Sequence, residues 1–163
     1  MISIRTITYE TSSTANEIMS RIGWAVEKVD SLLNAQLNSM TVETNKKWTG
    51  IVNKELNQFN IMEPGKFFGI KMFQIFLKGK VIESDSGIKV KIKFVPGLYL
   101  FLCLIFLYSA TALMIGVFIS TPTTENIGSF LMWLLVFPVL GSYLLIRKLN
   151  KLEKRIENLM DLQ

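Results

Sequence analysis

The sequence predicts a membrane protein with a small α+β cytoplasmic domain, a two-helix transmembrane hairpin and a short C-terminal helix. Two observations predict this class. Residues 95–146 are almost wholly apolar, with one acid, Glu125, and no base. Residues 1–94 instead mix polar and apolar positions as a water-soluble domain does. A bilayer imposes this segregation because its hydrocarbon core does not solvate charge.

Three domains are therefore expected. Residues 1–94 form the cytoplasmic domain, with one helix packed on a mainly antiparallel sheet. Residues 95–146 form the transmembrane hairpin, and residues 147–163 form a cytoplasmic amphipathic helix.

The first elements of the cytoplasmic domain are a strand and a helix. Residues 2–10 are rich in β-branched side chains, which favours a strand. Thr14 and Glu17 have the spacing of a capping box, which predicts that a helix begins there. We expect this helix to end near Leu37. Its apolar face is expected to comprise Ile18, Ile22, Ala25, Val29, Leu32 and Leu33.

Four further strands are expected from period-two alternation. Residues 48–56 and 58–62 form one pair, and residues 73–83 and 88–94 form a hairpin around the loop 84–87. This loop places lysines opposite lysines across the hairpin, since Lys80 then faces Lys91 and Lys78 faces Lys93. Like charges in direct register are destabilising.

One face of this hairpin is therefore a candidate binding surface. One interpretation is that the lysines contact acidic lipid headgroups, each gaining about 1 kcal/mol. The alternative is a solvated sheet edge, where lysines discourage aggregation. The residues concerned are Lys78, Lys80, Lys89, Lys91 and Lys93.

The two expected membrane spans are residues 98–119 and 127–146. Each is long enough to cross a hydrocarbon core of about 30 Å. The loop 120–126 contains no base, whereas lysines precede the first span and bases follow the second. The positive-inside rule then places both termini in the cytoplasm of a multi-pass protein of the inner (plasma) membrane.

Small residues along both spans suggest helix packing. Packing within the hairpin is favoured over oligomerisation, because small residues are common in membrane helices. Neither span contains Asp, Glu, Lys, Arg or His, which argues against a pump or a proton-coupled carrier. A pore lined by Ser109, Thr111 and Ser142 is a less favoured alternative. The expected packing residues are Ser109, Ala112, Gly116, Gly128 and Gly141.

The last seventeen residues show a heptad-like pattern that predicts a short coiled-coil helix. Three roles remain open: a coiled coil between subunits, docking on the cytoplasmic domain, or insertion in the headgroup layer. The first two are favoured because acids in the segment would be repelled by an acidic leaflet. The expected seam comprises Leu149, Leu152, Ile156 and Leu159.

The chemistry-bearing residues argue against catalysis. The chain has no histidine and one cysteine, Cys103, and it lacks a Gly-rich phosphate loop or a nucleophile–base arrangement. We therefore expect no enzyme activity, no cofactor and no metal. The net charge of +5 is concentrated near the first span, so it does not call for a nucleic-acid partner.

Several short motifs carry a family resemblance. They are Trp48–Ile51, Phe59–Ile61, Lys78–Val81 and Ser86–Ile92, all ahead of the apolar region. In this order they resemble small, uncharacterised bacterial two-span membrane proteins with a cytoplasmic β-rich domain before a transmembrane hairpin. Ile88 stands where that pattern often has threonine, and the usual proline before the third motif is missing. The resemblance implies a fold and an inner-membrane setting, and it transfers no activity.

The function expected from these features is a membrane-anchored interaction or scaffold protein with a small cytoplasmic domain at the inner leaflet. One alternative is a stress or phage-defence effector that oligomerises and permeabilises the bilayer. Another is an accessory subunit of a larger membrane complex. The expected partners are the lipid bilayer, anionic headgroups, and either further copies of the chain or a larger membrane complex.

Overall fold

The computed structural model describes residues 3–32, 46–64, 74–84, 87–120 and 124–161, with the side chains of residues 118 and 124–138 left out. The chain divides into two compact units. Unit 1 comprises Met1–Leu100 together with Glu153–Gln163, and unit 2 comprises Phe101–Leu152. The C-terminal residues thus belong to the same unit as the N-terminal domain, which the expected domain boundaries did not foresee.

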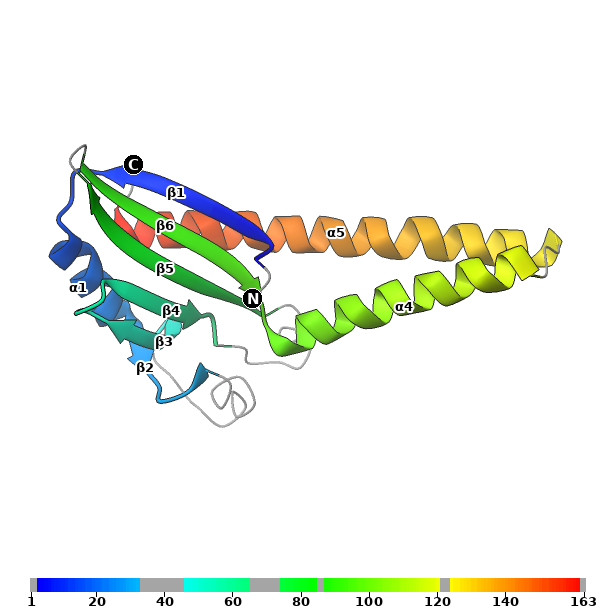
Figure 1. Ribbon diagram of the computed structural model, residues 1–163, viewed down its shortest axis with the longest axis horizontal. Coiled ribbons are helices and arrows are strands. Elements are labelled where there is room, and N and C mark those ends of the chain that lie inside the picture. The colour runs from blue at the N-terminus through cyan, green and yellow to red at the C-terminus, as the bar shows by residue number, and fades with distance from the viewer. Residues whose placement is uncertain (1–2, 33–45, 65–73, 85–86, 121–123, 162–163) are drawn as a thin grey trace. The chain divides into compact units, whose positions relative to one another are not determined.

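Unit 1 is built on a six-stranded sheet within the described residues. The strand order is β1-β6-β5-β4-β3-β2 (Figure 1). The pairing of β2 with β3 is parallel and the other four pairings are antiparallel, so the sheet is mixed. The strands are β1 Arg5–Thr11, β2 Val26–Lys28, β3 Trp48–Asn53, β4 Gln58–Met62, β5 Ile75–Ser84 and β6 Gly87–Pro96.

Helix α1, Ala15–Ala25, begins with the predicted capping box. The Thr14 hydroxyl accepts a hydrogen bond from the Glu17 amide at 3.3 Å, and the Glu17 carboxylate accepts one from the Thr14 amide at 3.0 Å. These two bonds satisfy amides that the helix itself leaves unpaired. Ile18 and Ile22 are fully buried on its inner side.

The prediction that this helix continues to Leu37 is wrong. It ends at Ala25, and Val26 adopts an extended conformation with φ −101° and ψ 128°. Val26 is fully buried and pairs with Trp48, so strand pairing at a β-branched residue prevails over the helical period. Val29 and Leu32, expected on the helix face, instead pack against Met62, Phe76 and Val95. Leu33 and Leu37 lie outside the described residues.

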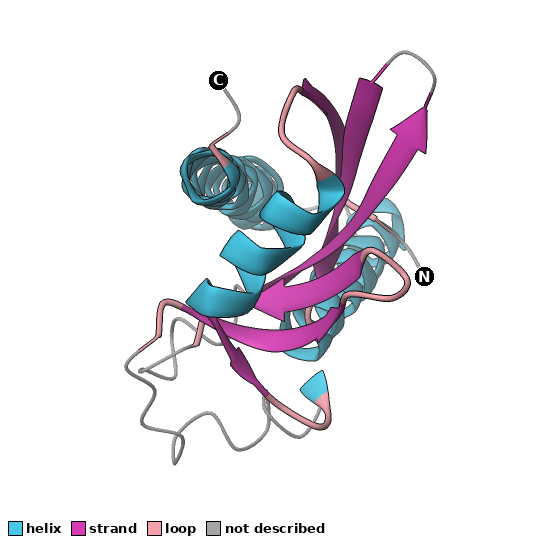
Figure 2. Cartoon of the chain, turned by 90° about the vertical axis from the view of Figure 1, so that its left-hand side faces the viewer, coloured by secondary structure: helices cyan, strands magenta, loops and turns pink. Residues whose placement is uncertain are grey.

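Most of the core of unit 1 lies on one face of the sheet, which we call the inner face, while a smaller buried cluster of Met62, Phe76 and Val95 lies on the opposite face. Helix α1 and the last turns of α5 cover it (Figure 2). Gly79 on β5 allows the ring of its cross-strand partner Phe59 to lie against the backbone, where a Cβ would overlap the ring. The fully or almost fully buried residues that the strands contribute are Phe59, Ile61, Leu77, Val81, Val90, Ile92 and Phe94.

The C-terminal part of this cover comes from α5, Thr124–Met160. Within Glu153–Gln163, the part that belongs to unit 1, Ile156 and Met160 are fully buried. The end of the chain is therefore part of the core of the sheet domain, and not a separate helix beginning at residue 147.

Unit 2 contains most of α4, Leu98–Ser120, and the first part of α5. The predicted two-helix transmembrane hairpin is not supported. Among the described residues, Leu98–Val117 is the one helical segment long and apolar enough to span a membrane. The second apolar stretch is instead the beginning of a 37-residue helix about 55 Å long. That helix continues without a break through Arg147 and Lys148, and a multi-pass topology is likewise unsupported.

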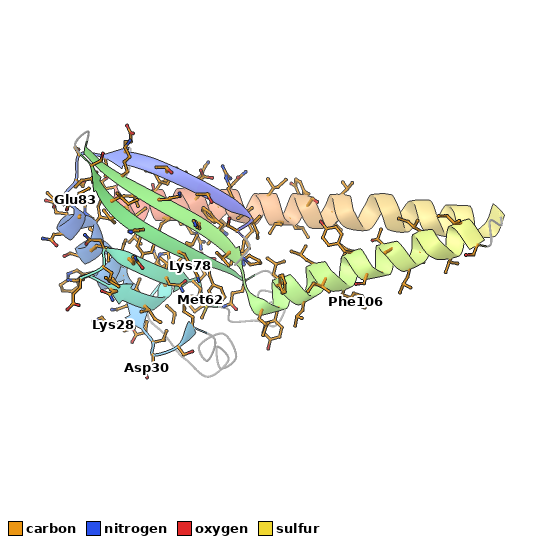
Figure 3. The ribbon with its side chains drawn as sticks, viewed as in Figure 1. Lys28, Asp30, Met62, Lys78, Glu83 and Phe106 are labelled. Carbon is orange, nitrogen blue, oxygen red and sulfur yellow. The ribbon has the colours of Figure 1, made fainter. Side chains whose placement is uncertain are left out.

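The surface of α4 is apolar and open. Only 6% of the window Leu98–Val117 is buried, and Phe106, labelled in Figure 3, is 72% exposed. The hydroxyls of Thr111 and Ser120 donate to the carbonyls of Leu107 and Gly116 in the same helix, at 2.8 and 2.9 Å. These polar groups are thus satisfied without any partner outside the helix.

Candidate functional site

The face of the sheet opposite the core, the outer face, carries the candidate site. We call its five lysines the lysine face: Lys78, Lys80, Lys89, Lys91 and Lys93. The predicted register is confirmed, because Lys78 pairs with Lys93 and Lys80 pairs with Lys91. Lys80, Lys91 and Lys93 are exposed, while Lys78 (labelled in Figure 3) and Lys89 are half-buried.

The spacing of a β-sheet brings these charges close together. Paired residues on neighbouring strands are about 5 Å apart, and residues two apart on one strand are separated by about 7 Å. The Cα atoms of the two lysine pairs therefore form a rectangle of about 5 by 7 Å. The four lysine side chains therefore begin close together on the sheet.

The position of the lysine face within the sheet tests whether these lysines protect a sheet edge. In the strand order, β5 and β6 both have neighbours on each side, whereas β1 and β2 are the edges. Lysines protect sheets from aggregation when they stand on an edge strand. Because Lys78–Lys93 and Lys80–Lys91 join two internal strands, the edge-protection interpretation does not explain them.

Acidic partners are scarce on this face. Glu10 on β1 contacts Lys89 at 3.0 Å. Within the described part of the chain, Lys80, Lys91 and Lys93 have no carboxylate within 4.0 Å. The face therefore has a concentrated positive charge that the described acids do not neutralise.

Neutral polar residues flank the lysines on both sides. On β1, Thr6 pairs with Lys93 and Thr8 pairs with Lys91, and both threonines are exposed. On β4, Gln58 pairs with Lys80. Hydroxyl and amide groups donate hydrogen bonds to anionic oxygens, as ammonium groups do. The arrangement places several donors for anionic oxygens on one face of the sheet.

The inner face holds the C-terminal end of α5 with polar contacts as well as apolar ones. Arg5 forms an ion pair with Glu153 at 2.9 Å, and the hydroxyl of Tyr9 donates to Glu157 at 3.0 Å. Arg21 of α1 donates to the carbonyl of Met160 at 3.0 Å. The end of the helix is thereby fixed to both β1 and α1.

A further ion pair joins this segment to the region after β4, since Arg155 contacts Glu63. Sequence reasoning did not identify Arg5, Tyr9, Arg21 or Glu63 as docking residues. A signal was present on β1, where Arg5 and Tyr9 share a strand face with Ile7. When Arg and Tyr side chains share a strand face with apolar residues, their polar end groups indicate that another element with polar side chains covers that face.

This environment changes the acidity of Tyr9. Burial first, and then the hydrogen bond to the Glu157 carboxylate, raise the pKa of Tyr9 above its ordinary value of 10.0. The phenol consequently stays protonated and donates to Glu157 well into the alkaline range. In unit 2, burial and the neighbouring charge of Lys151 lower the pKa of Lys148.

The expected coiled-coil seam is buried within a single chain. Leu149, Leu152 and Ile156 are buried, whereas Leu159 is half-buried and Met160 takes the fully buried position. For Ile156, which lies in unit 1, the observed role is docking on the sheet domain. Docking was one of the three roles left open by the sequence.

The small residues of the helices are not brought together. A Cβ placed on Gly116 or Gly141 would meet no described heavy atom within 4 Å. Ser109 and Ala112 are exposed on α4, and the side-chain environment of position 128 lies outside the described part. Packing within the hairpin is thus not observed at the two described glycines.

Other chemistry at the described residues is limited. They contain no group of three or more His, Cys, Asp or Glu side chains that could hold a metal ion. Cys103 lies exposed on α4. The lysine face remains the candidate site, and its ammonium groups are of the kind that contact anions.

Comparison with known proteins found no matching family model, no matching curated protein and no matching solved structure.

Proposed function

We propose that this chain is a membrane-associated interaction protein, in which α4 inserts into a bilayer and the six-stranded unit presents a binding surface beside it. The observation that carries the proposal is the exposure of α4. An apolar helix of 20 residues with 6% of its window buried lacks the protein surroundings of a soluble core helix. Lipid tails supply the missing apolar environment.

The energetics of α4 agree with insertion. The window Leu98–Val117 contains eleven Leu, Ile, Phe and Val residues. At about −0.3 to −0.6 kcal/mol each, they favour insertion by about 3 to 7 kcal/mol. The 23-residue helix is about 34 Å long and matches a hydrocarbon core of about 30 Å. Its Thr111 and Ser120 hydroxyls bond within the helix, which lowers the cost of placing them in lipid.

The placement of the sheet domain follows from the composition of unit 1. This unit contains the N-terminal strands, the C-terminal turns of α5 and also Leu98–Leu100, the first residues of α4. Bases lie close to this end of the apolar helix, including Lys93 just before α4. By the positive-inside rule we place this unit on the cytoplasmic side.

The test uses Cys103, the single cysteine of the chain. The full-length protein is placed in phosphatidylcholine nanodiscs and treated with a membrane-impermeant maleimide. We expect labelling to be strongly slowed relative to the denatured protein, because a membrane-impermeant reagent does not enter the hydrocarbon core. A matched control carries Cys103→Ser and Glu55→Cys, which moves the thiol to the exposed turn between β3 and β4. The control should react rapidly in the same discs.

Equal labelling rates at position 103 and at position 55 would show that α4 stays in water, and the proposal would then fail. Labelling of Cys103 that is slow both in nanodiscs and after transfer to a detergent-free buffer would also contradict it. In that case protein, and not lipid, would shield the helix.

The second candidate is a subunit of a larger membrane complex. It is favoured by the open space at Gly116 and the exposure of Ala112 one turn before it, because small residues allow another helix to approach closely. Mass analysis of the intact assembly, extracted from cells in mild detergent, tests this candidate. A complex containing a second, larger membrane protein would support it, and a monomer would exclude it.

A further inference from the structure

We propose that the lysine face of the sheet binds the anionic headgroups of phospholipids in the leaflet that α4 enters. This inference rests on the proposed function, because it requires α4 to hold the sheet domain at a bilayer. It adds the chemical identity of a ligand and the side chains that contact it.

The lysine pairs repel one another, which costs free energy in the folded protein. Two lysine pairs stand in direct register on neighbouring internal strands, and like-charge pairs of this kind destabilise a sheet. Glu10 compensates Lys89, whereas Lys80, Lys91 and Lys93 have no described carboxylate within 4.0 Å. Bound anions remove the repulsion between Lys80 and Lys91, so an anionic partner converts an unfavourable arrangement into a favourable one.

A short segment of chain connects the lysine face to α4. Lys93 precedes Leu98, the first residue of α4, by five residues. Five residues of fully extended chain reach about 17 Å, so this lysine cannot be far from the start of the apolar helix. Leu98–Leu100 belong to unit 1 together with the sheet, which makes the link to the first turn of α4 a folded one. If α4 is in a bilayer, the lysine face is close to headgroups.

The spread of the lysines along β6 favours a lipid surface over other anions. The lysines span about 13 Å along β6, from Lys89 to Lys93, on a broad face. This spread suits several headgroups in a plane better than one small ion. Nucleic acid is disfavoured because single-stranded binders add aromatic platforms, and the aromatic residue of β5 on this face, Phe76, is buried. Each lysine close to an anionic leaflet favours the bound state about fivefold.

The experiment measures the modification of individual lysines in the full-length chain. The protein is placed in nanodiscs of phosphatidylcholine alone, or of equal parts phosphatidylcholine and phosphatidylglycerol. An uncharged acylating reagent is applied briefly, and each lysine is quantified by peptide mass spectrometry. We expect Lys80, Lys91 and Lys93 to react several-fold more slowly in the anionic discs. Lys28 and Lys54, exposed lysines away from this face, serve as internal controls and should react equally in both.

A variant pair tests whether the face acts as a unit. Lys80→Gln combined with Lys91→Gln should abolish most of the protection of Lys93 in anionic discs. The matched control, Lys28→Gln with Lys54→Gln, removes the same charge elsewhere and should leave that protection intact. High salt should reduce the protection in the unmodified protein, because exposed charges are screened.

Three outcomes would overturn the inference. One is equal reactivity of the lysine face in neutral and anionic discs. Another is uniform slowing of all lysines, including the controls. The third is protection in neutral discs by soluble glycerophosphate or by a short RNA, which would identify a different anion as the ligand. Cys103 labelling is measured in the same discs. If Cys103 is shielded while the lysines are not, the headgroup inference fails and the membrane proposal stands.

Discussion

The two faces of the sheet are built from alternate residues of the same strands and serve opposite purposes. On β6, Ile92 is fully buried on the inner face, while its neighbours Lys91 and Lys93 are exposed on the outer face. The inner face is covered by α1 and the end of α5. The outer face presents positive charge that the described acids leave largely uncompensated. The period of two therefore lets one pair of strands carry both buried apolar side chains and exposed lysines.

Burial on the inner face offsets the cost of the lysine pairs on the outer face. A like-charge pair costs a fraction of a kcal/mol, whereas each large side chain buried on the inner face contributes about 1.5 to 3 kcal/mol. Ile92, Phe94 and Leu77 are all fully buried opposite the lysine face. The burial on the inner face thus outweighs the repulsion between the lysine pairs on the outer face.

The largest predicted effect comes from opening the inner face. Ile156→Ala removes a fully buried side chain where the end of α5 meets the sheet. We expect a loss of about 2 to 5 kcal/mol in the stability of unit 1, as for other large-to-small core substitutions. Hydrogen exchange of the β1 and β6 amides, measured on the full chain in nonionic detergent, should become faster.

The matched control for this change is Asn158→Ala, two residues along the same helix and exposed. It should leave exchange in β1 and β6 nearly unchanged. If Ile156→Ala also leaves the exchange unchanged, then the end of α5 does not stabilise the sheet, and the two faces differ less than the structure indicates.

Sequence reasoning succeeded where the determinants are local. The capping box at Thr14 and Glu17 and the pairing of Lys78 with Lys93 both depend on a few neighbouring residues and on the length of one turn. These features follow from spacing alone, since backbone hydrogen bonds fix the geometry once a turn or a cap is given. The register that places these lysines opposite one another therefore follows from the sequence.

The failures arose where distant parts of the chain decide the outcome. Val26 leaves the helix because it pairs with Trp48, which lies 22 residues away, and no local pattern reports such a pairing. For Ile156 the heptad spacing left docking and a coiled coil both open, because such spacing does not specify a partner. Its neighbour Glu157 accepts a hydrogen bond from Tyr9 on β1, 148 residues earlier, which no local spacing reports. The second apolar stretch was read as a span ending at Ile146, although the helix continues to Met160.

A smaller effect is predicted for the polar contact that fixes the end of α5. Tyr9→Phe removes the hydrogen bond to Glu157 and should cost about 1 kcal/mol at neutral pH. The pKa of Tyr9 is raised in the folded protein, so above pH 10 the unfolded chain loses this proton while the folded chain keeps it. Stability from this group is full below pH 10 and falls as the pH rises further.

The measurement is the urea midpoint of the full chain in nonionic detergent, between about pH 9 and about pH 11. The difference between the unmodified protein and Tyr9→Phe should shrink as the pH rises. Lysines titrate in the same range but do so in both proteins, so their contribution cancels in the difference. A gap that stays constant with pH would show that the phenol is not held in its protonated form by the fold.

The smallest predicted effect is a gain in stability on the outer face. Lys80→Gln removes one member of the Lys80–Lys91 pair, and we expect the full chain in nonionic detergent to become about 0.2 to 1 kcal/mol more stable. Lys91→Gln should give a similar gain, and the double variant should gain less than the sum, because either change relieves the same repulsion. High salt should shrink each gain, and Lys54→Gln, outside the face, should give none.

A loss of stability on Lys80→Gln would mean that these lysines do not repel one another in the folded protein. The case for an anionic partner would then lose its energetic basis, even if the lysines remained exposed.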